Sequence, residues 1–103
     1  MGVEVLNKAT FKQVISGSTT PVIVDFYADW CQPCRRISPL LEEISNENKG
    51  KLSVYKVNTD LDPDLAMEFS VTSIPNIVSF KNGQLYKRVV GVAPKEELLD
   101  LVQ

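Results

Sequence analysis

Residues 21–34 decide the fold, and they run PVIVDFYADWCQPC. The first eight residues of this stretch are nearly all apolar, as in a parallel β-strand that is buried on both faces of a sheet. The stretch ends in Cys31 and Cys34, the only two cysteines among 103 residues. A helical pattern follows directly, so a strand delivers a Cys-x-x-Cys motif to the N-terminus of a helix. This placement makes one thiol acidic and lets the other close on it, which indicates dithiol–disulfide chemistry.

Two other roles remain open for the cysteine pair at this point. A purely structural disulfide would close a very small ring, which stabilises the fold by about 2 kcal/mol in the loop-entropy account. Half of a structural zinc site is the second alternative, because such a site takes four Cys or His ligands. The chain has no histidine and no second cysteine pair, so zinc would need a symmetric dimer or carboxylate ligands. We therefore expect no metal.

The composition indicates a single globular domain over residues 1–103, with 44% hydrophobic and 23% charged residues. The net charge of −2 gives no electrostatic reason to expect nucleic acid or an anionic membrane as partner. We see no secretory signal at the N-terminus and no stretch as long as a membrane span. We therefore expect a cytoplasmic protein, in a reducing compartment where a cysteine pair is more often catalytic than structural.

Several mechanism classes are excluded by what the sequence lacks. Without histidine there is no Ser-His or Cys-His nucleophile pair and no imidazole base. The five glycines are scattered, so no glycine-rich phosphate loop is present. Proton transfer must therefore use a thiol, a carboxylate, a lysine or water.

Hydrophobic periodicity predicts elements in the order β-α-β-α-β-α-β-β-α. Asn7 and Asp62 are expected to cap the first and third helices, and Asn82-Gly83 is expected to turn a hairpin. This order predicts one α/β domain with a mixed sheet and helices on both faces. The predicted strands are 3–6, 21–28, 52–57, 77–80 and 85–90, and the helices are 8–17, a long one from the cysteines to Gly50, a short one from Pro63, and a last one from Pro94.

Asp25 is unusual because it places a carboxylate in the middle of the buried strand. Burial disfavours the charged form, so we expect the pKa of Asp25 to be raised. Lys56 lies in the next predicted strand, and pairing with it would offset part of the cost. A buried pair of this kind is equally compatible with a functional and a structural role.

The chain resembles thioredoxins over essentially its whole length. The resemblance is carried by the run from Val24 to Cys34, Pro39, Ile74-Pro75, Lys81-Asn82-Gly83 and Gly91. It implies the thioredoxin fold, a central five-stranded mixed sheet flanked by four helices, and a general protein disulfide reductase activity. It also implies electrons from a thioredoxin reductase and disulfide-containing client proteins, without a bound cofactor. Nothing in the sequence demands more than a monomer.

The resemblance also implies roles for individual residues. Cys31 would be the attacking thiol and Cys34 the resolving thiol, with Asp25 as the proton acceptor for Cys34. Cys34 follows Cys31 by one helical turn, so we expect it to be the more buried of the two. Pro75 would be a cis-proline facing the disulfide, although a trans bond is the default for such residues. The surface on which clients dock would consist of Trp30, Ile74, Pro75, Gly91 and Val92, and the residues that tune the redox chemistry would be Gln32, Pro33 and Lys56.

The sequence departs from the commonest thioredoxin pattern at five positions. Gln32 replaces a glycine, Tyr27 stands where tryptophan is common, and Asn76 stands where threonine is frequent. Arg35 and Arg36 replace a lysine and an apolar residue. Arg35 projects from the same helix face as Cys31 and would add positive charge there, unless it is only a solvated surface cation. None of these changes removes a catalytic group, and those at Gln32, Arg35 and Arg36 bear on redox potential and partner preference rather than on the class of reaction.

Two alternatives to a reductase are kept. A thioredoxin-fold oxidant or isomerase would use the same cysteines, and the lack of a signal peptide argues against it. A non-catalytic binding subunit would need no thiols at all. Turnover of a disulfide substrate separates these classes.

Overall fold

The computed structural model describes residues 3–103, and its five strands form one mixed sheet in the order β1-β3-β2-β4-β5. β3 pairs in parallel with β1 and β2, whereas β4 runs antiparallel to both β2 and β5. The long apolar strand therefore lies at the centre, as its composition predicts. The strands are β1 (Glu4–Val5), β2 (Val22–Tyr27), β3 (Ser53–Asn58), β4 (Asn76–Lys81) and β5 (Gln84–Val90).

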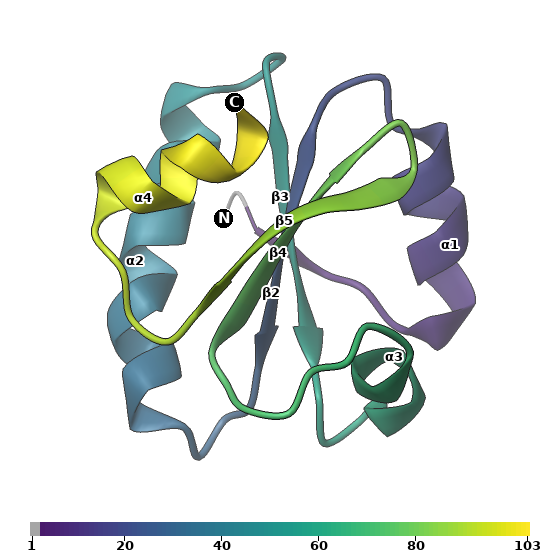
Figure 1. Cartoon of the computed structure of the whole chain (residues 1–103), viewed down its shortest axis with the longest axis vertical. Coiled ribbons are helices and arrows are strands. Elements are labelled where there is room, and N and C mark those ends of the chain that lie inside the picture. The colour runs from purple at the N-terminus through teal and green to yellow at the C-terminus, as the bar shows by residue number, and fades with distance from the viewer. Residues whose placement is uncertain (1–2) are drawn as a thin grey trace.

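Helices cover both faces of the sheet, with α1 and α3 on one face and α2 and α4 on the other (Figure 1). The order of elements and the two helical layers confirm the predicted α/β architecture. The final helical segment is shorter than predicted, because it continues as a 3₁₀ turn over Asp100–Val102. The helices are α1 (Lys8–Gly17), α2 (Gln32–Glu47), α3 (Pro63–Glu68) and α4 (Lys95–Leu99).

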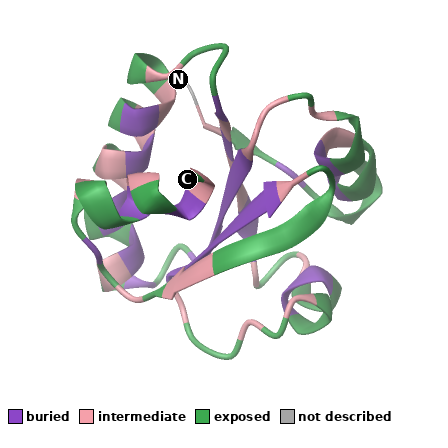
Figure 2. Ribbon diagram, turned by 45° about the horizontal axis from the view of Figure 1, so that its top comes forward, coloured by how far each residue is buried: buried purple, intermediate pink, exposed green. Residues whose placement is uncertain are grey.

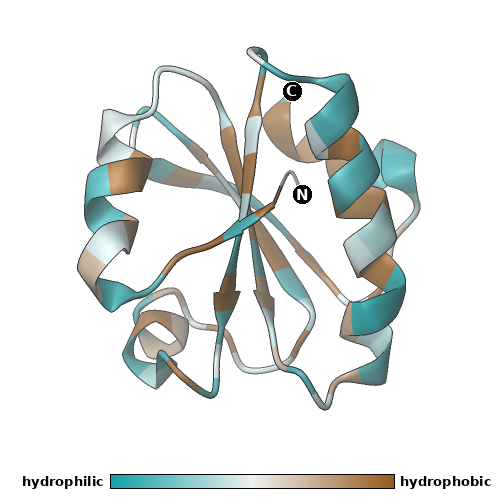
Figure 3. Cartoon of the chain, turned by 180° about the vertical axis from the view of Figure 1, so that it is seen from behind, coloured by the Kyte–Doolittle hydropathy of each residue, from teal (hydrophilic) through white to brown (hydrophobic). Residues whose placement is uncertain are grey.

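Side-chain alternation along the strands builds a separate hydrophobic core on each face. In β2, Val24 packs in the core beneath α1 and α3, whereas Ile23 packs in the core beneath α2 and α4. Figure 3 shows hydrophobic and hydrophilic residues alternating along α2, and the apolar stripe includes Ile37, Leu41 and Ile44. Asp25 has the parity of Ile23, so it points to the side of α2, where the cysteines lie.

Both predicted helix caps lie at the expected positions, but only Asn7 makes the capping hydrogen bonds. The side chain of Asn7 accepts a hydrogen bond from the N–H of Thr10, and the Thr10 hydroxyl accepts one from the N–H of Asn7. Asp62 precedes α3 but makes no such bond to that helix. Its Oδ1 instead accepts the backbone N–H of Lys8 at 3.0 Å, at the start of α1. A partner from a distant element has displaced the local cap.

The hairpin between β4 and β5 turns at Asn82-Gly83, as predicted. Asn82 has φ of 54° and Gly83 has φ of 79°, the left-handed pair that a two-residue hairpin turn requires. β5 is an edge strand, and Figure 2 shows it largely exposed beside the buried central strands. Within residues 3–103, no helix is both long and apolar enough to cross a membrane.

Candidate redox site

The cysteine pair lies where β2 passes into α2. Cys31 is the residue that caps α2, and Cys34 lies in the first turn of that helix. A disulfide joins them across a Cα–Cα distance of 5.3 Å. The structure thus holds the oxidised state of the predicted dithiol. Gln32 and Pro33 lie between the cysteines, Gln32 exposed and Pro33 half-buried.

The sulfur of Cys31 takes the place of a capping oxygen. It accepts a hydrogen bond from the backbone N–H of Cys34 at 3.2 Å. The first N–H groups of a helix have no partner within the helix, and they carry partial positive charge. After reduction, these groups stabilise a thiolate on Cys31 relative to the thiol. This geometry favours the thiolate at Cys31 over the thiolate at Cys34.

Burial does not distinguish the two cysteines, although we expected Cys34 to be the more buried. Cys31 is 3% exposed and Cys34 is 4% exposed in the disulfide form. Both pack with Ala28, and with Tyr27 and Ile74 at the edge of the same cluster. The expectation of unequal exposure is therefore wrong for this oxidised state, because both residues are buried in the same cluster.

Asp25 lies in the middle of β2 and is 3% exposed. Its Oδ1 has no hydrogen-bond partner in the structure. Burial raises the pKa of Asp25 from 3.8 to about 7, and the positive charge of Lys56 works in the opposite direction. A carboxyl group with this pKa can take up or release a proton near neutral pH, as a general acid or base must.

Lys56 lies directly opposite Asp25 in the parallel pairing of β2 with β3. Its ammonium group stands 4.9 Å from the centre of the Tyr27 ring, in a cation–π contact. The possible direct ion pair with Asp25 is not formed, since none of the ion pairs found among residues 3–103 joins these two side chains. Lys56 therefore acts on the carboxylate through longer-range attraction.

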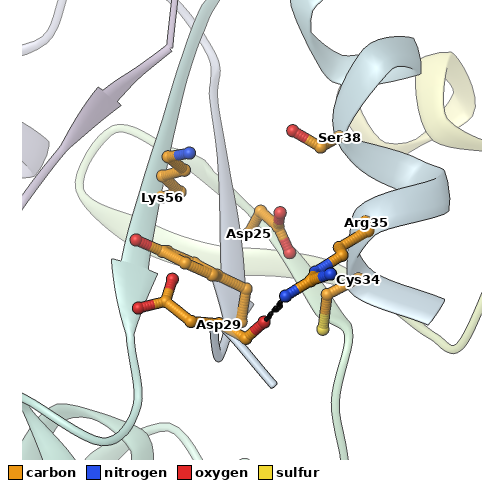
Figure 4. Close-up of a pocket in the computed structure, with 7 residues that line it drawn as sticks. Asp25, Asp29, Cys34, Arg35, Ser38 and Lys56 are labelled. Carbon is orange, nitrogen blue, oxygen red and sulfur yellow. Dashed lines mark hydrogen bonds between the residues drawn. The ribbon is translucent and has the colours of Figure 1, made fainter. Parts of the chain in front are cut away.

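A cavity of about 340 Å³ connects Asp25 with Cys34 (Figure 4). In the close-up, the Asp25 carboxylate lies between the side chain of Lys56 and the side chains of Arg35 and Cys34, which belong to α2. The cavity is open enough to admit water, so a proton can move between the thiol and the carboxyl group through solvent. Its lining consists of Asp25, Tyr27, Asp29, Cys34, Arg35, Ser38 and Lys56.

Arg35 makes a contact that the sequence did not reveal. Its Nε and Nη2 both donate to the backbone carbonyl of Asp29, at 3.2 and 2.8 Å (Figure 4). Arg35 is thus held at the mouth of the cavity and fixes the link between β2 and α2. No sequence signal indicates this contact, because its acceptor is a main-chain oxygen.

The residues expected to form the docking surface differ in exposure and in their contacts with the disulfide. Trp30 is 68% exposed and Val92 is 51% exposed, whereas Ile74 is half-buried against the cysteines. The Ile74–Pro75 bond is cis, as the resemblance implied, and Pro75 is buried. Gly91 has φ of 91°, and its N–H donates to the Pro75 carbonyl at 2.8 Å.

Asp60 also belongs to this surface, although no sequence pattern points to it. Its Oδ2 accepts a hydrogen bond from the indole Nε1 of Trp30 at 2.9 Å. The bond fixes the orientation of a large exposed ring beside the disulfide. Asp60 is one of several acidic residues in its segment, so the sequence alone could not single it out.

Among residues 3–103 there is no group of three or more His, Cys, Asp or Glu side chains placed to hold a metal ion.

Comparison with known proteins defines the class of protein. The thioredoxin family model matches residues 2–103. The chain is 43% identical to the chloroplastic M-type thioredoxin of Pisum sativum over 101 residues, which are 98% of this chain and 59% of the pea protein. It is 42% identical to the thioredoxin of Synechocystis sp. over 98 residues, which are 95% of this chain and 92% of that protein. The chain therefore belongs to the thioredoxin family.

A third relative joins this domain to another activity. The chain is 45% identical, over 97 residues, to the bifunctional thioredoxin reductase/thioredoxin of Mycobacterium leprae, covering 94% of this chain and 21% of that protein. The chain spans only a little over half of the pea protein, 59% of its length.

Unequal alkylation of the two thiols is the expected result for the reduced protein near neutral pH. Iodoacetamide should modify Cys31 at least about tenfold faster than Cys34, because helix N–H groups stabilise the Cys31 thiolate. Timed quenching followed by peptide mass spectrometry measures both rates. In the denatured protein the two rates should converge. Equal rates in the folded protein, or faster reaction at Cys34, would reverse the assigned roles.

Proposed function

We propose that this chain reduces protein disulfides by dithiol–disulfide exchange. The observation that carries the proposal is the position of the Cys31 sulfur, which caps α2 and lies within disulfide reach of Cys34. Membership of the thioredoxin family supports the same activity. Within this proposal, residues 1–103 act as one thioredoxin domain.

The reaction needs two exchange steps. The Cys31 thiolate attacks one sulfur of the client disulfide, so that a Cys31–client bond forms and the client S–S bond breaks. The released client thiolate takes a proton from solvent. Cys34 then loses its proton and attacks the Cys31 sulfur, which forms the disulfide seen here and releases the second client thiol. Two electrons have passed from the cysteine pair to the client.

Asp25 is proposed as the group that accepts the proton of Cys34. Both residues line the same cavity, and the pKa of Asp25 is raised to about 7 by burial. Near neutral pH the carboxyl group can therefore exist in either form, which suits a base that must later release its proton. The half-buried Lys56 favours the ionised form of this base.

A client chain is proposed to dock on the surface around the disulfide, which consists of Trp30, Ile74, Pro75, Gly91 and Val92. Exposed apolar side chains beside the sulfurs support this role, since they offer area to a client without a charge barrier. Ile74 packs against the cysteines, and the N–H of Gly91 donates to the carbonyl of Pro75.

Three further residues are proposed to tune the redox chemistry. Gln32 and Pro33 shape the turn that spans the cysteines, because proline fixes its own backbone angle. Lys56 acts through Asp25, whose pKa it lowers. Changes at these positions should alter the redox potential rather than remove the reaction.

Electrons are proposed to come from a thioredoxin reductase, in keeping with the fused reductase and thioredoxin of the M. leprae relative. We propose a reducing compartment such as the cytoplasm, since the cycle must begin from the dithiol. Cysteines, carboxylate and docking residues all come from one chain, so a monomer is sufficient for the reaction.

Turnover of insulin disulfides tests this function. With dithiothreitol as electron donor near neutral pH, a catalytic amount of the protein should accelerate the reduction many-fold. The Cys31→Ser/Cys34→Ser double variant serves as the control and should not accelerate it. A parent protein that failed to exceed this control would be a binding module and not a reductase. Equilibration with glutathione separates a reductase from an oxidant, since a reductase must be the stronger reducing partner.

A further inference from the structure

The connection between α3 and β4 carries two of the proposed docking residues, Ile74 and Pro75. It runs over residues 69–75 at the end of the molecule where β2 passes into α2 (Figure 1). Thr72 and Ser73 in its middle are exposed, and they belong to no helix or strand. A segment of this kind keeps its place only if specific contacts hold it.

Asn76 holds the middle of this connection. It follows Pro75 at the start of β4 and is 2% exposed, so its amide needs partners within the protein. Its Nδ2 donates to the backbone carbonyl of Ser73 at 3.2 Å. Within residues 3–103, we find no second hydrogen bond to the backbone of residues 72–74.

Arg88 on β5 completes this network from the neighbouring strand. Its Nη1 donates to Oδ1 of Asn76 at 2.9 Å, and its Nη2 donates to the carbonyl of Phe69 at 2.6 Å. Phe69 lies at the start of the connection, directly after α3. One guanidinium group therefore fixes the first residue of the connection directly and its middle through Asn76.

The strand register makes these contacts possible. Asn76 pairs with Val90 and Val78 pairs with Arg88, so Arg88 is the diagonal neighbour of Asn76 on one face of the sheet. The two separate N–H donors of arginine match two acceptors at different places. A lysine would replace these two separate donor groups with a single ammonium group.

We propose that Arg88 and Asn76 are positioning residues for client docking. They act through the connection, holding Ile74 and Pro75 against the cysteine pair so that a client backbone finds the docking surface already formed. This inference rests on the proposed function, because it concerns how clients reach the same sulfurs. It predicts weaker binding of protein clients when the network is broken, with the exchange chemistry itself unchanged.

The test compares Arg88→Met with the parent in single-turnover reactions of the pre-reduced proteins. The client is insulin, and the small disulfide 5,5′-dithiobis(2-nitrobenzoate) serves as a substrate that needs no docking. We expect the half-saturating insulin concentration to rise five- to tenfold. The rate at saturation and the rate with the small disulfide should stay within twofold of the parent.

Companion variants show whether the effect passes through the network. Asn76→Ala should reproduce the effect, and the double variant should be no worse than either single variant. The half-saturating insulin concentration of Arg88→Lys should lie between those of the parent and Arg88→Met. Lys87→Met is the matched control, because Lys87 directly precedes Arg88 in β5 and its ammonium group donates to the Asp100 carbonyl, away from the connection. The Gly91 amide, which donates to Pro75, should exchange its proton faster in Arg88→Met but not in Lys87→Met.

Each outcome decides the proposal. An unchanged half-saturating concentration in Arg88→Met, or an equal loss of rate with both substrates, would overturn it. If Arg88→Met did not fold, Asn76→Thr would carry the same test, since threonine is too short to join Arg88 to Ser73. If the parent reduced neither substrate, the proposed function itself would be wrong. If the parent reduced both substrates, a negative result with the variants would count against the positioning role alone.

Discussion

Cys31→Ser is expected to lose all turnover of insulin disulfides, because serine leaves no thiolate at the N-terminus of α2. Cys34→Ser is expected to stop after one step. Its Cys31 still attacks the client, but no second thiol resolves the mixed disulfide. Non-reducing electrophoresis and intact mass should therefore show a stable covalent adduct with Cys34→Ser and none with Cys31→Ser.

These losses are not expected to arise from unfolding. The Cys31–Cys34 disulfide closes a small ring, which stabilises the oxidised protein by about 2 kcal/mol at most in the loop-entropy account. Circular dichroism of both variants should therefore match that of the reduced parent. Continued multiple turnover by Cys34→Ser would exclude the dithiol mechanism.

Asp25→Asn is expected to separate stability from activity. Asparagine has nearly the same volume as aspartate, and it removes the cost of an ionised carboxylate at a buried site. Lys56 makes no direct ion pair with Asp25 and lies against Tyr27, so the substitution does not strip it of a bonded partner. The variant should therefore be at least as stable as the parent.

The difference in stability should depend on pH, with a sign fixed by the raised pKa. In the unfolded chain Asp25 ionises near 3.8, whereas in the folded protein it keeps its proton up to about pH 7. The folded state thus binds more protons between these values, and the free energy of unfolding of the parent falls as pH rises through this window. The pKa difference corresponds to roughly 4 kcal/mol as an upper limit.

Denaturant unfolding of the oxidised proteins at pH 4 and pH 8 measures this effect. Asp25→Asn should resemble the parent at pH 4 and be more stable by up to a few kcal/mol at pH 8. Asp29→Asn is the matched control, because it removes an exposed carboxylate from the same cavity. An equal advantage for Asp25→Asn at both pH values would contradict the raised pKa.

Turnover by Asp25→Asn should fall, although its stability should rise. The resolving step in Asp25→Asn should slow by about tenfold or more, because the proton of Cys34 must then pass to water without a nearby base. Rapid-quench analysis of the mixed disulfide measures that step directly. An unchanged rate would show that Asp25 is only a structural group.

Short-range physics explains which parts of this protein could be predicted from its sequence. The cap at Asn7 and the turn at Asn82-Gly83 depend on residues that are neighbours in the chain, and both predictions were confirmed. The alternating apolar patterns of strands and the helical patterns are also local in the chain, and they predicted the order of elements. Cys31 at the start of α2 was predicted because strand, motif and helix are consecutive.

Resemblance supplied what local patterns could not. The cis bond before Pro75 contradicts the default for proline, and only the likeness to thioredoxins predicted it. The part played by Asp25 was open on composition alone, since burial of a carboxylate fits a structural pair as well as a base.

Tertiary structure decided the contacts between distant residues, because they depend on which side chains converge when the layers close. The Asp62 side chain bonds the start of α1 and not its own helix, and the Lys56 ammonium group contacts the Tyr27 ring and forms no ion pair with Asp25. Arg88 reaches Phe69 and Asn76, which no periodicity or spacing in the chain connects. The sequence by itself determined the elements, their order and the reactive pair. The folded structure decided how polar groups are satisfied around that pair, because a buried donor or acceptor takes whichever partner the packing brings within reach.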